Sequence, residues 1–348
     1  MRNQPGNTRV TLADVARAAG VATMTVSRYF NERPNVTQKT ARKVKAAIDA
    51  LGYKPNIAAR ILMGQPSRVI GLIIPNLANP FFSVIAQSVQ QRAHASGYLV
   101  WIAATNDSAE MDVELIEQMR DHHVDGILLA ASPRTQLRPE LLGELPVVAL
   151  DRPIAGVSTD LVTIEDRNAA RQATDHLISH GYERIASFGL TPEIEPIKER
   201  IRGYQEAMHS HGLTPLPYVQ CEDVPSALRV IRKALSGKAP VQAIFPANNA
   251  ASILALEALN FMGYSIPDKV AFLSYGEIPL GHIFQPPISA VVQPVSKLGE
   301  RATEFLLDRI ANKRPASGIR LTIPASLVLR GSCGCKPLKN DKWEPATA

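Results

Sequence analysis

The 348-residue sequence predicts a small all-α helix-turn-helix head followed by an α/β body of two doubly wound subdomains. Three observations lead to this fold class. Short apolar periodicities with helix-capping residues occupy the first 55 residues. From residue 69 onward, apolar runs typical of buried parallel strands alternate with helical stretches. There are roughly ten of these strand–helix units, which is more than a single sheet normally holds. The number therefore favours two similar subdomains.

The head contains three expected helices. Thr11, followed three residues later by Asp14, is typical of a capping box and begins the first helix, which Gly20 interrupts. Thr37 can cap the third helix, and Gly52 ends it. Two helices around a tight glycine turn, with a third that closes the core, make a helix-turn-helix unit.

The second expected helix, VATMTVSRYF at 21–30, separates two kinds of side chain. Its apolar face carries Val26, Tyr29 and Phe30. Its outward side chains are Thr23, Met24, Thr25, Ser27 and Arg28. Short hydroxyls suit the major groove of DNA, where an arginine can also hold guanine through two hydrogen bonds. This helix therefore predicts contact with DNA.

The body alternates between strands and helices. The run VIGLIIP at 69–75 is continuously apolar, and it leads to Asn79-Pro80, an N-cap residue followed by proline in the first helical turn. Further strands are expected at 98–104, 126–131, 146–151, 184–189, 243–247 and 270–276. Helices are expected near 110–122, 168–180, 202–211, 254–262 and 298–310.

Charge is distributed unevenly along the chain. Residues 1–68 hold 12 of the 38 Lys and Arg but only 3 of the 32 Asp and Glu, a balance of +9 within a total of +6. The remaining 280 residues carry −3. A basic head on a near-neutral body suggests a polyanionic partner that touches the head, with a solvated basic surface as the alternative.

Several classes of protein are not expected. No apolar run approaches the ~18 residues of a membrane span, and the N-terminus lacks the apolar stretch of a secretory signal. Three cysteines, Cys221, Cys333 and Cys335, are too few for a disulfide framework, so a cytoplasmic protein is expected. The motifs GxGxxG, GxxxxGK[ST], HExxH and GxSxG are absent, so neither an enzyme nor a cofactor is expected.

The chain also offers few metal ligands in sequence. His176 and His180 lie four residues apart on an expected helix, but no third ligand is suggested nearby, so no metal site is expected. Cys333 and Cys335 form a closely spaced pair near the C-terminus. A reduced pair of thiols is the expectation, with a redox or metal role as the alternative.

The sequence as a whole resembles the lac-repressor (LacI/GalR) family of bacterial transcription regulators. The resemblance rests on ordered motifs that include TLADVARAAGVATMTVSRYFN, SRVIGLIIPNLANPFF, ATDHLISHGYERIASFG, ERIRGYQEAM, PPISAVVQP and LVLRGS, and it covers residues 10–332. It implies a homodimer, or a tetramer, whose paired heads bind a pseudo-palindromic operator. The lack of a heptad-bearing helix after Lys336 favours the dimer.

The resemblance implies roles for individual head residues. Those at base-reading positions are Thr23, Met24 and Arg28, and those at backbone-holding positions are Thr11, Leu12, Ser27, Asn31, Thr37, Thr40, Tyr53 and Asn56. Met24 stands where a polar residue is common, and it suits a thymine methyl group or, alternatively, packing within the helix unit. Leu62 matches a leucine that wedges into a minor-groove step, with Ala59 the small residue beside it.

The domain boundaries follow from these matches. They place a DNA-binding domain at 1–55, a hinge helix or linker at 56–67, an effector-binding and dimerisation body at 68–336 and a disordered tail at 337–348. The body resembles the periplasmic sugar-binding fold. Its N-subdomain is expected at about 68–163 plus 296–322, and its C-subdomain at about 164–292 plus 323–332.

The same resemblance implies an effector cleft between the two subdomains. Its expected residues are Phe81, Phe82, Asp151, Arg200, Asn248, Gly276 and Gln293. Phe81 and Phe82 could stack on a ring, with core aromatics as the alternative.

Two positions depart from the family pattern. The chain has Asn249 and Gly276 where acidic residues are common, and it retains Arg200 with Lys198 nearby, which favours an anionic effector such as gluconate, ketogluconate or a sugar phosphate. Glu277 is the alternative source of the missing acid. We therefore expect a repressor released by a small sugar-type effector. The alternative is a sugar-binding or sugar-processing α/β protein without sequence-specific DNA binding.

Overall fold

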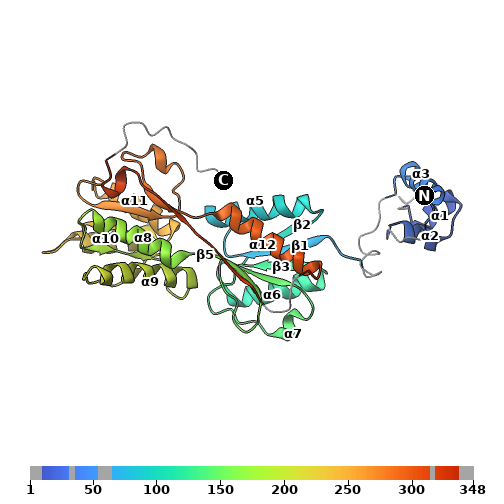
Figure 1. Ribbon diagram of the computed structural model, residues 1–348, viewed down its shortest axis with the longest axis horizontal. Coiled ribbons are helices and arrows are strands. Elements are labelled where there is room, and N and C mark those ends of the chain that lie inside the picture. The colour runs from blue at the N-terminus through green and yellow to red at the C-terminus, as the bar shows by residue number, and fades with distance from the viewer. Residues whose placement is uncertain (1–9, 31–35, 54–64, 314–317, 337–348) are drawn as a thin grey trace, which may run out of the picture. The chain divides into compact units, whose positions relative to one another are not determined.

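The computed structural model describes residues 10–30, 36–53, 65–313 and 318–336. The chain divides into two compact units, Met1–Ser67 and Arg68–Ala348 (Figure 1). Within the described residues, no helix is long and apolar enough to cross a bilayer.

The head is a three-helix unit. Its helices are α1 (Leu12–Ala19), α2 (Thr23–Phe30) and α3 (Gln38–Leu51). The capping box expected at the start of α1 is confirmed, because the Thr11 and Asp14 side chains each bond the other residue's backbone N–H. Gly20 and Gly52 adopt left-handed φ values of 64° and 58° and so end α1 and α3. The core between the helices includes Val15, Val26, Val44 and Tyr53. The predicted helix-turn-helix fold is confirmed.

The first lobe of the body is built on a six-stranded, all-parallel sheet with the order β12-β5-β4-β3-β1-β2. The strands are β1 (Val69–Ile74), β2 (Leu99–Ala104), β3 (Gly126–Leu129), β4 (Val147–Leu150), β5 (Asp160–Ile164) and β12 (Arg320–Ile323). Helices α5 (Pro80–Ala95) and α12 (Val295–Ile310) pack together over one face. Helices α6 (Ala109–Asp121) and α7 (Pro139–Leu142) lie on the other face (Figure 1).

The second lobe has a five-stranded sheet with the order β13-β11-β10-β9-β6, in which only β13 is antiparallel. Its strands are β6 (Ile185–Ala186), β9 (Ala243–Ile244), β10 (Ala271–Tyr275), β11 (Ser289–Val292) and β13 (Ser326–Val328). Its helices are α8 (Asp166–Ser179), α9 (Glu195–Ser210), α10 (Val224–Leu235) and α11 (Asn249–Phe261). Helices α8 and α9 cover one face, and α10 and α11 cover the other.

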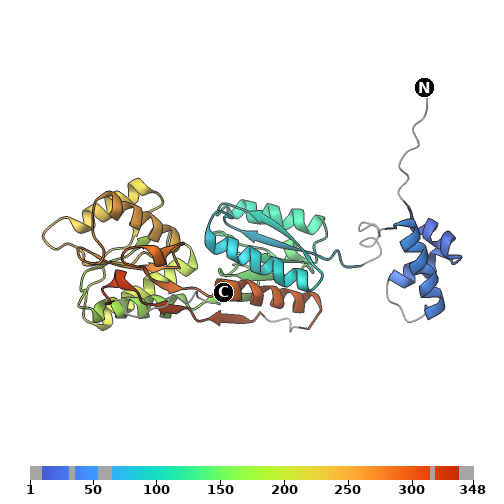
Figure 2. The ribbon, with the colours of Figure 1, turned by 90° about the horizontal axis from the view of Figure 1, so that it is seen from above.

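Short elements complete the second lobe. They are the strand pair β7 (Phe188–Gly189) and β8 (Val219–Gln220) and the 3-10 turns η1 (Gly281–Ile283) and η2 (Gly331–Cys333). The chain passes between the lobes three times, from β5 to α8, from β11 to α12 and from β12 to β13. The last of these crossings, in red, is visible from both directions (Figures 1 and 2). The predicted pair of doubly wound subdomains is confirmed.

The structure differs from the sequence-based elements in its details. The strand expected at 184–189 is two short strands, β6 and β7, which belong to different sheets. The helix expected at 202–211 begins seven residues earlier, at Glu195, with a proline in its first turn. Strands β5, β11, β12 and β13 and helix α10 were not expected at all. All four of these strands are only three to five residues long, which leaves little periodicity to detect.

Close packing of α8 against α9 depends on Gly203. A Cβ atom added there would lie 2.1 Å from the carbonyl oxygen of Arg167 and 3.0 Å from the Cβ of Ala170. In most helices Gly→Ala stabilises by up to ~1 kcal/mol. Here we expect Gly203→Ala to lower the free energy of unfolding by about 1–3 kcal/mol, because the two helices must move apart.

Chemical denaturation of the full chain measures this effect. His209→Ala, at an exposed position near the end of α9, is the matched control and should change stability by less than about 0.5 kcal/mol. A Gly203→Ala protein as stable as the wild type would contradict the packing described here.

Candidate functional site

Helix α2 presents a polar face to solvent. Met24 is 64% exposed, and Thr23 and Arg28 are also exposed, whereas Val26 on the opposite side is fully buried. Thr25 and Ser27 are half-buried between these faces. The exposure of Met24 argues against its alternative role as a packing residue within the helix unit.

The hydroxyls of other predicted DNA-contacting residues already serve the local fold. The Thr11 hydroxyl caps α1, and the Thr37 hydroxyl caps α3 by accepting from the Thr40 backbone N–H at 3.3 Å. Leu12 is half-buried. The Tyr53 ring is buried and packs 6.0 Å from the ring of Phe30, so this residue contributes to the head core. Four further predicted contacts lie outside the described residues: Asn31, Asn56, Ala59 and Leu62.

A cleft lies between the two lobes of the body, and residues from both lobes line it. Its polar residues directly follow strands, as expected at the carboxyl ends of parallel sheets: Asp151 follows β4, and Gln293 follows β11. The lining residues are Asn79, Phe81, Phe82, Asp151, Arg152, Leu190, Ile194, Pro196, Ile197, Arg200, Asn248, Asn249 and Gln293.

Arg200 is held from one side by buried partners. Its Nε donates to Asp166 Oδ1 at 2.8 Å, and its Nη1 donates to the Ala247 carbonyl at 3.0 Å. The Tyr275 ring lies 4.0 Å from the guanidinium carbon, and the Tyr275 hydroxyl donates to the same Asp166 oxygen at 2.6 Å. Its Nη2 donates no hydrogen bond to the described residues.

Asp151 is a buried carboxyl group without a full set of partners. Its Oδ1 atom accepts no hydrogen bond from the described residues, and its nearest cation, Arg152 Nε, lies 3.9 Å from Oδ2. Burial, together with the negative charge of Asp166, raises the pKa of Asp151 to about 6. The group therefore changes its charge near neutral pH and can accept a hydrogen bond from a ligand hydroxyl.

Polar contacts join the two lobes at the cleft side. At the surface, Arg134, after β3, pairs with Glu193, before α9, at 2.6 Å. Asn249 Nδ2 donates to Asn79 Oδ1 at 2.8 Å, so an amide from the start of α11 meets the N-cap residue of α5. The buried Gln293 Nε2 has no partner among the described residues. Gly276, with a φ of 94°, lies beside both groups. A Cβ atom on Gly276 would lie 3.0 Å from the Asn249 Cβ.

The structure gathers the sequence-predicted cleft residues, except that Gly276 lies behind the lining. Phe81 is half-buried at the cleft, whereas Phe82 belongs to the first-lobe core. Sequence reasoning missed Asn79 and Arg152. Both were detectable, since Asn79 caps a helix after an apolar strand and Arg152 follows Asp151.

Glu277 is ion-paired with Arg330 at 3.0 Å and is absent from the lining, which removes it as the substitute acid.

The sequence suggests no third metal-binding side chain near His176 and His180, but the fold brings one close to them. Cys335 lies beside them, and the donor atoms of His176, His180 and Cys335 are all within 4.8 Å of one another. The sequence could not indicate this neighbour, because Cys335 is more than 150 residues away along the chain and only the tertiary fold brings it close.

Comparisons with known proteins match both parts of the chain. Residues 11–56 match the family described as bacterial regulatory proteins, lacI family, and residues 174–333 match the periplasmic binding protein-like domain. The ribose operon repressor of Halalkalibacterium halodurans is 32% identical over 320 residues, which is 92% of this chain and 96% of that protein.

Two further similarities extend over nearly the whole chain. The transcriptional regulator PtxS of Pseudomonas aeruginosa is 32% identical over 336 residues, covering 94% of this chain and 97% of that protein. A solved complex of the transcriptional regulator CelR with cellobiose is 28% identical, with a TM-score of 0.68, and covers 93% of this chain and 100% of that chain. These proteins are named as regulators and not as enzymes.

The raised pKa of Asp151 predicts a pH-dependent stability. In the unfolded chain this carboxyl group loses its proton near pH 4, before the folded state does, so the free energy of unfolding falls as pH rises from about 4 to about 6. Asp151→Asn cannot ionise, and asparagine tolerates the left-handed φ of 64° at this position. We expect this variant to be more stable than the wild type at pH 7.5, by up to about 3 kcal/mol, with the difference vanishing near pH 4.

Thermal unfolding of the full chain between pH 4 and 8 measures the difference. Asp121→Asn removes an exposed carboxylate and is the control, with little expected effect at any of these pH values. A stability difference for Asp151→Asn that stays constant across the range would contradict the assignment.

Proposed function

The chain belongs to the lacI family of bacterial regulatory proteins, and from this premise we propose how it reads DNA and which effector it senses. It is a ligand-responsive transcriptional repressor and not an enzyme. It binds a pseudo-palindromic operator as a dimer in the cytoplasm and leaves it when a small sugar-type effector enters the cleft. The observation that carries this proposal is the pairing of a basic head, with an exposed polar face on α2, and a ligand cleft in the body.

The head reads the operator through α2. Arg28 bonds a guanine edge, Thr23 bonds a base edge and Met24 contacts a thymine methyl group. Residues 1–55 form the DNA-binding domain, and residues 56–67 form a hinge whose Leu62 enters the minor groove beside Ala59. Basic residues elsewhere in the head contact phosphates, which makes binding dependent on salt.

The effector is a sugar acid or a sugar phosphate. Support comes from the free Nη2 edge of Arg200, which suits one oxygen of a carboxylate or phosphate. Asp151 Oδ1 and Gln293 Nε2 are an acceptor and a donor without protein partners, which suits ligand hydroxyls. Phe81 supplies an apolar surface for the face of the ring.

Ligand binding changes the arrangement of the lobes. Residues from both lobes line the cleft, so the effector favours whichever arrangement brings them onto it together. The Asn249–Asn79 bond and the Arg134–Glu193 pair are the protein's own contacts between the lobes. A shift between the lobes then alters the spacing of the paired hinges, and induction follows when the ligand-bound arrangement binds the operator less well.

The first prediction from this proposal concerns operator recognition. The full chain selects its operator from randomised DNA, and binding is measured at two salt concentrations. We expect Arg28→Ala to weaken binding to the selected operator at least tenfold, because a bidentate contact is worth about 1–3 kcal/mol, and to change binding to random DNA much less.

Lys45→Ala removes the same charge from an exposed position on α3 and is the matched control. This variant should weaken binding to the selected operator and binding to random DNA about equally. Equal losses from Arg28→Ala on both DNAs would refute base reading by α2.

The second prediction concerns the effector. A thermal-shift panel compares gluconate, 2-ketogluconate and hexose phosphates with neutral hexoses. We expect an anionic ligand to raise the melting temperature most and to release the selected operator. Arg200→Lys keeps the charge but loses the planar guanidinium, so it should lower the affinity for the anionic ligand by roughly tenfold.

Lys198→Gln is the control, because Lys198 pairs with Glu195 outside the cleft lining and should leave ligand affinity unchanged. Tighter binding of a neutral hexose than of any anion in the panel contradicts the proposed effector class.

A further inference from the structure

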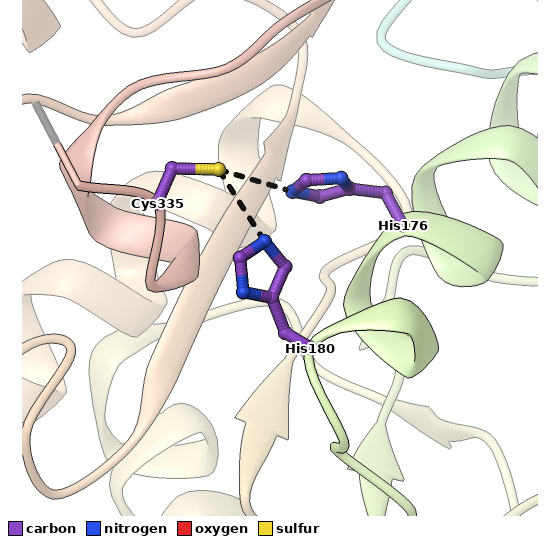
Figure 3. A group of neighbouring side chains, drawn as sticks. All are labelled: His176, His180 and Cys335. Carbon is purple, nitrogen blue, oxygen red and sulfur yellow. Dashed lines mark hydrogen bonds between the residues drawn. The ribbon is translucent and has the colours of Figure 1, made fainter. Parts of the chain in front are cut away.

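Two histidines and two cysteines converge on one side of the second lobe. Helix α8 places His176 and His180 one turn apart, with their ring centroids 4.8 Å from each other. The turn η2 and the residue pair after it bring Cys333 and Cys335 against the same side of α8. Figure 3 shows both imidazole rings directed at the Cys335 sulfur from one side.

The distances fit coordination of a single ion. Cys335 Sγ lies 3.4 Å from His180 Nε2 and 3.6 Å from His176 Nε2, and Cys333 Sγ lies 3.3 Å from His176 Nε2. Around tetrahedral zinc, bonds of about 2.3 Å to sulfur and about 2.0–2.1 Å to nitrogen give a sulfur–nitrogen separation of about 3.6 Å. These three sulfur–nitrogen pairs therefore already stand at nearly the spacing that one zinc ion imposes.

Surrounding residues hold the cysteines in place. The Ser289 hydroxyl donates to Cys333 Sγ at 3.1 Å, and the same oxygen accepts from the Arg330 backbone N–H. Gly334 turns the chain between the cysteines with a φ of 95°, and a Cβ atom there would lie 2.5 Å from the Tyr182 hydroxyl oxygen. The backbone geometry and the outer contacts that a metal site needs are thus supplied by this lobe.

We propose that His176, His180, Cys333 and Cys335 bind one zinc ion, which fastens the C-terminal segment to α8. Two nitrogen and two sulfur donors in a tetrahedral arrangement are the set that zinc favours. The ion joins residues about 155 positions apart in sequence and so stabilises the second lobe independently of the effector cleft. This site does not depend on the proposed effector.

The experiment uses the full chain without a histidine tag, treated with EDTA, dialysed and kept reduced with a phosphine. Zinc content is measured after equilibration, and Co²⁺ is titrated as the spectroscopic probe. We expect one ion per chain, a sulfur-to-cobalt charge-transfer band and a higher melting temperature with zinc. His180→Gln and Cys335→Ser should lower affinity by roughly a hundredfold or more, and Cys333→Ser should reduce the charge-transfer band by about half.

The matched controls remove the same residue types elsewhere. Cys221→Ser and His209→Gln should bind zinc and cobalt as the wild type does. His180 is exposed, so His180→Gln tests the site without disturbing the core, and circular dichroism verifies the fold of each variant. The proposal is overturned if the reduced wild type takes up no ion, if His180→Gln binds as tightly as the wild type, or if the cobalt-loaded protein shows no sulfur-to-cobalt band.

Discussion

The cleft depends on the buried ion pair between Asp166 and Arg200. Asp166 is the first residue of α8, directly after the chain crosses from β5 into the second lobe. A buried carboxylate is costly unless it is paired and hydrogen-bonded, and here Arg200 and the Tyr275 hydroxyl both contact the same oxygen. Because these partners come from α9 and β10, the pair fixes the crossing segment against the sheet. It also fixes the guanidinium, so only its Nη2 edge is open to the ligand proposed above.

The charges around the cleft are nearly balanced, which constrains the ligand. Arg152 is paired with Asp107 at 2.5 Å, and Arg200 is paired with Asp166, so each guanidinium already has a carboxylate. Asp151 is the remaining acid, and its raised pKa reduces its negative charge near neutral pH. A ligand with two separate anionic groups would find too little positive charge, and an apolar ligand would leave Asp151 and Gln293 without partners. A hydroxyl-rich molecule with one anionic group matches the available positive charge and gives Asp151 and Gln293 hydrogen-bond partners.

Local signals allowed much of this structure to be predicted. Capping residues such as Thr11 and Asn79 act within four residues, and continuous apolar runs mark the strands that lead to the cleft. Features built by distant contacts could not be predicted in this way. Strand β12 pairs with β5 from about 160 residues away, and Asn249 meets Asn79 from 170 residues away. Cys335 reaches the histidines of α8 in the same way, and for that reason the sequence suggested no third ligand.

The three crossings and the Asn249–Asn79 bond together make the body suitable for switching. Short crossing segments keep the lobes attached but allow small rotations, because residues at element ends absorb changes in φ and ψ. The neutral Asn249–Asn79 bond contributes about 0.5–1.5 kcal/mol, and the exposed Arg134–Glu193 pair contributes about 0–1 kcal/mol, so these contacts cannot hold one arrangement against a well-placed ligand. Shifting an equilibrium from 1:99 to 99:1 requires about 5.5 kcal/mol of preference for one arrangement. Contacts to Arg200 and Gln293 in one lobe and Asp151 in the other can supply that preference only if one ligand touches all three. Ligand size, as well as ligand charge, is therefore a condition for the release proposed above.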